Sequence, residues 1–181
     1  MFIQGGGEGT HDDWDDKLVD SLRRELGDGF DVRYPRMPDE DDPTYATWAP
    51  AIRGELAALD AGGVVVGHSV GATILVQVLG EERRPEPTLG AIVLLAAPFV
   101  GRDGWPGVEF ELPHDLGSRL PRGVPVHVFH GLDDDTVPAV HADLYARAMP
   151  LAQVHRLRGR DHQLGDDLSE VARVIRTVAA G

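Results

Sequence analysis

The sequence predicts an α/β protein, a three-layer α/β/α sandwich in which a parallel sheet lies between two layers of helices. Two observations support this fold class. Apolar runs of strand length alternate with longer stretches of helical pattern, and runs such as 64–66 and 91–96 are continuously apolar. Alternating strands and helices favour a parallel sheet. Continuous apolar runs are typical of strands that helices cover on both faces.

Six parallel strands are expected, with helices between them. The strands are expected at residues 1–4, 30–34, 63–67, 91–96, 124–129 and 153–157. The helices are expected near residues 13–26, 45–60, 70–82, 138–148 and 166–179. The last helix has the clearest period, because its apolar residues recur on one face at helical spacing.

The length of 181 residues fits one domain, residues 1–181. A chain of this size buries about 70 % of the surface of its unfolded form, so it needs neither a disulfide nor a metal to fold. Since the chain has no cysteine, disulfide scaffolds, thiolate metal sites and cysteine nucleophiles are excluded.

Residues 97–123 interrupt the alternation of strands and helices. The segment is rich in proline and glycine, carries Phe99, Trp105 and Phe110, and is too short for a second domain. Two interpretations stay open. It is either a surface excursion that shapes a pocket, or a solvent loop whose aromatic side chains pack against the body of the protein.

The composition limits the partners of the protein. A net charge of −13 repels nucleic acid and anionic membrane surfaces. No apolar run approaches the length of a membrane span, and the start of the chain does not resemble a signal peptide. We therefore expect a cytoplasmic protein, a monomer or homodimer, that acts on a small molecule without contacting nucleic acid or a membrane.

Residues 67–71 read Gly-His-Ser-Val-Gly and follow a run of valines. This G-x-S-x-G pattern is the sequence form of a nucleophile elbow, which presents a serine on a strained turn between a strand and a helix. Ser69 is therefore the candidate nucleophile.

Further polar residues follow two later predicted strands. Asp134 lies in the segment after 124–129, and His162 in the segment after 153–157. Active sites of open α/β sheets collect at the carboxyl ends of the strands. A serine hydroxyl needs an imidazole to take its proton, and the imidazole needs a carboxylate to orient it. The order Ser, Asp, His is that of a known catalytic triad.

Over essentially its whole length the chain resembles the α/β hydrolases, in particular their small single-domain serine esterases. The resemblance rests on four segments: Gln4–Gly7, Gly67–Gly71, His130–Pro138 with its H-G-x-x-D-x-x-V-P pattern, and Gly159–His162. It implies the α/β-hydrolase fold without the usual N-terminal hairpin, hence a minimal six-stranded sheet. It also implies a catalytic triad of Ser69, Asp134 and His162, with no cofactor.

Two positions depart from the family pattern. Gln4 stands where the family typically has a histidine, and Gln163 follows the candidate catalytic histidine in place of an aromatic or small residue. The resemblance also assigns the oxyanion donors. They are the amide of Val70, which follows the nucleophile, and the amide of Gly6 in the loop after the first strand.

Each assignment has an alternative. Asp134 could merely cap the helix near Pro138 while Asp133 or Asp135 orients the histidine. His68 is expected to pack beside the elbow, and His130 to hold the acid-bearing loop by hydrogen bonding. The glycines of residues 5–9 could cradle a phosphate, but a Walker lysine and a G-x-G-x-x-G fingerprint are both lacking.

No metal site is expected, because runs of adjacent carboxylates rarely converge on one ion and no helical H-x-x-x-H spacing occurs. Trp48, Phe99 and Trp105 are candidate pocket walls. The predicted function is a serine hydrolase of the carboxylesterase type that cleaves a small acyl ester through an acyl-enzyme. The alternatives are a catalytically inactive binding protein with the same fold, and an acyltransferase or perhydrolase that uses the same triad.

Overall fold

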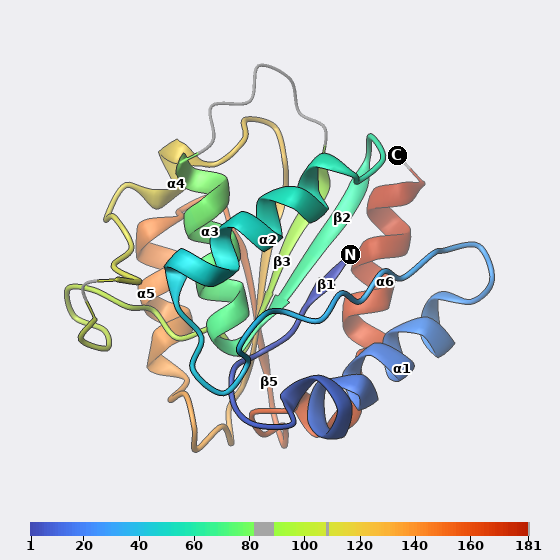
Figure 1. The fold of residues 1–181 in the computed structure, drawn as a ribbon, viewed down its shortest axis with the longest axis horizontal. Coiled ribbons are helices and arrows are strands. Elements are labelled where there is room, and N and C mark those ends of the chain that lie inside the picture. Colours follow the sequence, from blue (N-terminus) through green and yellow to red (C-terminus); the bar gives the residue numbers. More distant parts are fainter. Residues whose placement is uncertain (82–88, 108, 181) are drawn as a thin grey trace.

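The computed structural model describes residues 1–81, 89–107 and 109–180, and its centre is a parallel sheet (Figure 1). The strands lie side by side in chain order, β1-β2-β3-β4-β5. Their bounds are β1 Phe2–Ile3, β2 Gly63–His68, β3 Leu89–Leu95, β4 Val126–Gly131 and β5 Gln153–Leu157. All four neighbouring pairs are parallel, so the carboxyl ends of the strands share one edge of the sheet.

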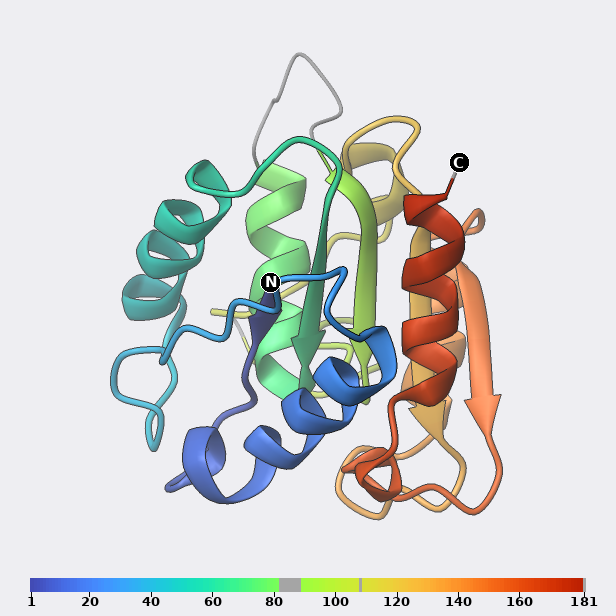
Figure 2. The same cartoon turned by 90° about the vertical axis from the view of Figure 1, so that its right-hand side faces the viewer.

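Helices flank the sheet on both faces (Figure 2). The helices are α1 Asp15–Leu26, α2 Tyr45–Ala57, α3 Ser69–Glu81, α4 Leu116–Arg119, α5 Val140–Ala148 and α6 Ser169–Ala179. Helices α1 and α6 pack together on one face, and α2, α3 and α5 cover the other. Among the residues described, no helix is long and apolar enough to cross a bilayer.

The continuous apolar runs are explained by two hydrophobic cores. Along β3, Ile92 and Leu94 join the core under α2, α3 and α5, whereas Val93 and Leu95 join the core under α1 and α6. Because successive side chains of a strand point to opposite faces, a strand buried on both faces needs every residue apolar. This confirms the interpretation of residues 91–96.

The sheet has five strands over the described residues, so the prediction of six is wrong. Residues 30–34 run beside β1 but contribute one backbone hydrogen bond, from the Phe2 amide to the Arg33 carbonyl (2.8 Å). The two-residue β1 offers too short an edge for a ladder. The Arg33 side chain binds the Ala58 carbonyl and Glu55 instead, so side-chain contacts hold this segment.

Residues 97–107 and 109–123 contain one short helix, α4, and pack mainly against the body. Phe99, Leu112, Leu116 and Leu120 are buried in the core under α3 and α5, and Phe110 packs against that core. Trp105 keeps 38 % of its surface exposed. Phe99 and Phe110 therefore fit the second interpretation, in which the aromatic side chains of this segment pack against the body of the protein.

Helix α3 begins in direct contact with the end of β1 and folds back close to β2, and one glycine permits each approach. A Cβ on Gly71 would lie 1.9 Å from the Gln4 carbonyl oxygen, and one on Gly67 would lie 2.6 Å from the Ala72 Cα. Both clashes are with backbone, which cannot swing aside. The two glycines of the G-x-S-x-G pattern are thus required by packing.

We predict that Gly71→Ala lowers the free energy of unfolding by about 1–3 kcal/mol or more, the usual range for overpacking. Gly54→Ala is the matched control, since a Cβ there meets nothing within 4 Å in the exposed middle of α2. That change should raise stability by about 0.5–1 kcal/mol. Urea unfolding followed by circular dichroism measures both, and equal effects would contradict the packing explanation.

Candidate active site

Ser69 lies at the junction of β2 and α3 with a backbone φ of 50°. Positive φ is uncommon for residues other than glycine, and such strain persists only where the surroundings enforce it. The strand before Ser69 and the helix after it are held by the contacts of Gly67 and Gly71. The structure therefore has the strained strand-to-helix turn that the pattern predicts.

Three predicted residues meet at the carboxyl edge of the sheet. His162 Nε2 lies 3.1 Å from Ser69 Oγ, and His162 Nδ1 lies 2.9 Å from Asp134 Oδ2. Asp134 follows β4 and His162 follows β5, so loops after three different strands supply the three side chains. The chain of hydrogen bonds runs from carboxylate to imidazole to hydroxyl.

Asp134 also caps the loop before α5, so its two expected roles coexist. Its Oδ1 accepts the amides of Thr136 (3.0 Å) and Val137 (2.8 Å), which leaves Oδ2 for His162. Burial raises the pKa of Asp134, but hydrogen bonds from His162 and Val137 outweigh burial and lower the pKa below its ordinary value. Asp133 and Asp135 are exposed.

His130 holds the acid-bearing loop, as expected. Its Nε2 lies 2.8 Å from the Val137 carbonyl and 3.5 Å from Asp134 Oδ2. Since a carbonyl only accepts, Nε2 carries the proton. Burial lowers the pKa of His130, which favours the neutral ring.

The glycine loop after β1 packs against Ser69 and Val70. A Cβ on Gly5 would lie 3.2 Å from Ser69 Cβ, and one on Gly6 would lie 2.9 Å from Val70 Cγ1. Val70 is in the first turn of α3, where amides have no acceptor within the helix. The two residues that carry the candidate amides, Gly6 and Val70, thus come from separate elements and lie close together.

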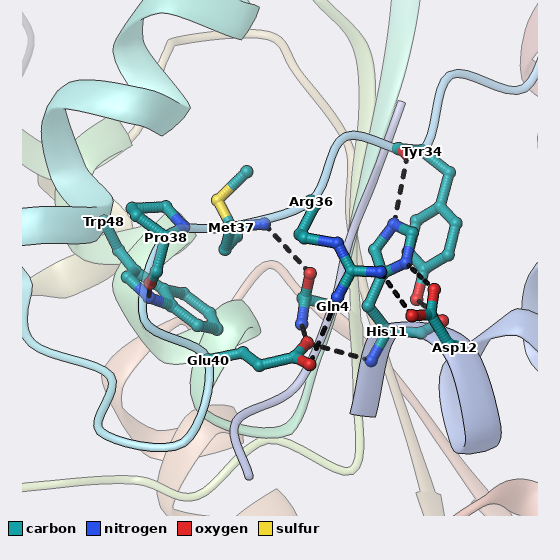
Figure 3. Close-up of polar contacts among 9 residues, drawn as sticks. All are labelled: Gln4, His11, Asp12, Tyr34, Arg36, Met37, Pro38, Glu40 and Trp48. Atoms are coloured by element: carbon teal, nitrogen blue, oxygen red, sulfur yellow. Dashed lines mark hydrogen bonds and ion pairs between the residues drawn. The ribbon is translucent and has the colours of Figure 1, made fainter. Parts of the chain in front are cut away.

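Gln4 anchors this loop, although the family pattern has histidine there. It is fully buried; its Oε1 accepts the Met37 amide (2.9 Å), and its Nε2 donates to Glu40 Oε2 (2.6 Å). Glu40 in turn accepts the His11 amide through its side chain and the Gly7 amide through its carbonyl. Figure 3 shows the side-chain part of this network. Both the oxygen and the nitrogen of the Gln4 side-chain amide have hydrogen-bond partners, so the loop is anchored without a histidine at this position.

The structure brings only one of the three predicted pocket walls to the surface. Trp48 has no exposed surface, and its indole donates to the Pro38 carbonyl (2.7 Å; Figure 3). Phe99 is also buried, with its ring edge-on to Tyr145. Both assignments as pocket walls are wrong, because core packing leaves these rings nothing to offer a substrate. Trp105 is exposed in part and packs edge-on to His141.

Sequence reasoning missed a buried carboxylate beside the site. Asp15 sits in a run rich in acidic residues at the start of α1, where carboxylates are usually solvated, yet it is fully buried. It accepts the Gly5 amide (2.7 Å) and pairs with His68 (2.9 Å). No local signal separates Asp15 from its acidic neighbours, since its partner is 53 residues away. Within the described part of the chain, no cluster of three or more potential metal ligands occurs.

Comparisons with known proteins agree with this geometry. A family described as serine hydrolases matches residues 5–163. A search of curated protein sequences gave no match. Among solved structures, the chain is similar to the ydeN gene product of Bacillus subtilis, with 19 % identity, a TM-score of 0.74, and coverage of 99 % of this chain and 98 % of that one.

Two further structures share the fold. One is the meta-cleavage product hydrolase CumD of Pseudomonas fluorescens, with 15 % identity, a TM-score of 0.70 and coverage of 99 % and 88 %. The other is an esterase domain of a Rhodothermus marinus protein, with 22 % identity, a TM-score of 0.65 and coverage of 98 % and 85 %. From the family match and the shared fold, the chain belongs to the serine hydrolases of the α/β-hydrolase fold.

Proposed function

We propose that this serine hydrolase is an esterase that cleaves small acyl esters through a covalent acyl-enzyme on Ser69. The observation that carries the proposal is the hydrogen-bond chain Asp134–His162–Ser69, with distances of 2.9 and 3.1 Å. These are hydrogen-bond distances at which a histidine can take the proton of a serine.

In the first half-reaction, His162 Nε2 accepts the Ser69 proton as Oγ attacks the acyl carbon. The carbonyl oxygen becomes an oxyanion, and the amides of Val70 and Gly6 donate to it. The carbon–oxygen bond to the alcohol then breaks, and His162 returns the proton to the leaving oxygen. The products of this half are the free alcohol and the ester of Ser69.

In the second half-reaction, water takes the place of the alcohol. His162 removes a proton from the water, which attacks the acyl carbon, and the proton passes to Ser69 Oγ as the acid departs. Asp134 stays ionised throughout and stabilises the imidazolium. The hydrogen bonds that lower its pKa support this role. The sequence of steps requires no metal and no cofactor.

We propose the size of the substrate from the segment that follows β3. Residues 97–107 and 109–123 hold one short helix where other hydrolases can carry a helical cap. A site without such a cap suits small acyl groups. Trp105, partly exposed against His141, is the proposed pocket wall.

Ser69→Ala and His162→Ala should each lower the turnover of p-nitrophenyl acetate by about 10⁴-fold or more, because each removes a member of a unit that acts together. Ser69→Ala should also abolish labelling by a fluorophosphonate probe. Ser118→Ala, on exposed α4, is the control and should label like wild type. A wild-type protein that neither labels nor hydrolyses short-chain esters would refute the proposed esterase.

Asp134→Asn should lower kcat by about 10⁴-fold. With the oxygen of the new amide accepting the loop amides, its NH₂ faces His162 Nδ1. The imidazole must then carry its proton on Nε2, where it cannot accept from Ser69. Asp133→Asn and Asp135→Asn are matched controls, since these carboxylates are exposed. If steady-state kinetics showed that Asp133→Asn or Asp135→Asn lowers kcat as much as Asp134→Asn does, the assignment of Asp134 as the triad carboxylate would be contradicted.

Gln4→Ala should lower kcat more than it raises KM. The change leaves the Met37 amide without its acceptor and removes one of the donors to the Glu40 carboxylate. We expect a cost of about 1–3 kcal/mol in stability and a looser loop around Gly6. Gln153→Ala on the exposed side of β5 is the control. If kcat stayed at the wild-type value while stability fell, the loop would not depend on Gln4 for its catalytic position.

A further inference from the structure

A second carboxylate–histidine pair lies directly behind the candidate triad. Asp15 of α1 and His68, the last residue of β2, are 0 % and 1 % exposed. His68 Nδ1 lies 2.9 Å from Asp15 Oδ1 and 3.0 Å from Oδ2. The ester mechanism described above uses neither side chain. A buried ion pair is costly unless its geometry is good and further hydrogen bonds satisfy its remaining polar atoms.

The partners of His68 determine its protonation. Nδ1 faces the Asp15 carboxylate, and Nε2 lies 3.1 Å from the His162 carbonyl oxygen. A carboxylate and a carbonyl only accept hydrogen bonds. With Asp15 ionised, both ring nitrogens of His68 donate, and the ring is an imidazolium.

The charges around the pair agree with this state. Burial alone lowers the pKa of His68, but the charge and hydrogen bond of Asp15 outweigh it, and the pKa lies above its ordinary value. Burial raises the pKa of Asp15, but His68, the Gly5 amide and Gln163 outweigh it, and the pKa lies below its ordinary value. The charge of Asp134 also faces His68 and favours the cation.

The pair touches each part of the candidate site. His68 precedes the nucleophile in the chain, donates to the backbone of His162, and has its ring centroid 4.9 Å from the His162 ring. Asp15 Oδ2 accepts the amide of Gly5, which precedes the candidate oxyanion donor Gly6. The Asp15–His68 ion pair thus connects the turn that carries Ser69, the candidate base His162 and the loop that carries Gly6.

We propose that Asp15 and His68 are positioning residues for catalysis. His68, protonated on both nitrogens, fixes the backbone of His162, and Asp15 fixes the oxyanion loop through Gly5. Neither side chain touches the reacting atoms. This inference rests on the proposed esterase function.

Asp15→Ala removes the acceptor of the Gly5 amide and the partner of His68 Nδ1. The oxyanion loop then loses its anchor, and buried His68 loses the carboxylate that orients its ring toward the His162 carbonyl. His68→Asn removes the hydrogen bond to His162 and leaves the buried Asp15 without its counterion.

The experiment measures kcat and KM for p-nitrophenyl acetate and the rate of fluorophosphonate labelling in wild type, Asp15→Ala, His68→Asn and the double variant. Each single change should lower kcat and the labelling rate by about 10–100-fold, the effect of a small misplacement of reacting groups. KM should change by less than about threefold. The double variant should be no slower than the slower single variant, because the two residues act as one unit.

Asp143→Asn and His114→Asn are the controls. Asp143 pairs with Arg156 on the surface and His114 is exposed, so their loss should leave labelling unchanged. Labelling of Asp15→Ala and His68→Asn at the wild-type rate would overturn the proposal, as would additive effects. Wild-type labelling alone tests the esterase function: if wild type does not label, that function fails and the positioning role fails with it.

A measurement on wild type keeps the proposal testable if a variant does not fold. Nuclear magnetic resonance of protein labelled with ¹⁵N-histidine should show His68 mostly protonated on both ring nitrogens at pH 6.5, because its pKa lies above the ordinary value, with a slowly exchanging proton on Nε2. A single ring proton at that pH would overturn the bridge between Asp15 and His162.

Discussion

The backbone contact between Gly71 and the Gln4 carbonyl is the constraint on which the site depends. It seats the first turn of α3 on the end of β1, where a Cβ would lie 1.9 Å from that oxygen. The same contact brings the loop after β1 against Ser69 and Val70, and it holds Ser69 at a φ of 50°. The packing of α3 against the end of β1 therefore places both the nucleophile and the candidate oxyanion donors, although the two elements are distant in sequence.

Three buried or half-buried carboxylates then fix the loops around this contact, and each binds two or more partners. Asp134 holds its own loop with one oxygen and His162 with the other. Asp15 binds the Gly5 amide and His68. Glu40 binds Gln4 and the His11 amide through one oxygen and Arg36 through the other. Because hydrogen-bond donors surround the two buried carboxylates, Asp134 and Asp15 keep their pKa values below the ordinary range despite burial.

Most of the fold was predictable because local patterns carry it. The runs that form β2 to β5 are apolar wherever both faces are covered, and the period of α6 shows in its sequence. Ser69, Asp134 and His162 were identified because motif and strand order point to the same edge of the sheet. Residues 30–34 have the apolar pattern of a strand, but pairing depends on the length of the neighbouring β1. Trp48 and Asp15 were misjudged because burial depends on what packs over a residue, and those elements lie far along the chain.

The central claim is that Ser69 carries the acyl group during turnover. Mass spectrometry of protein quenched within the first turnover of p-nitrophenyl acetate tests it most directly. We predict that an acetyl group is found on the peptide that contains Ser69 and that it disappears as turnover is completed. An acetyl group on another residue that turns over at the rate of catalysis, with Ser69 unmodified, would contradict the claim.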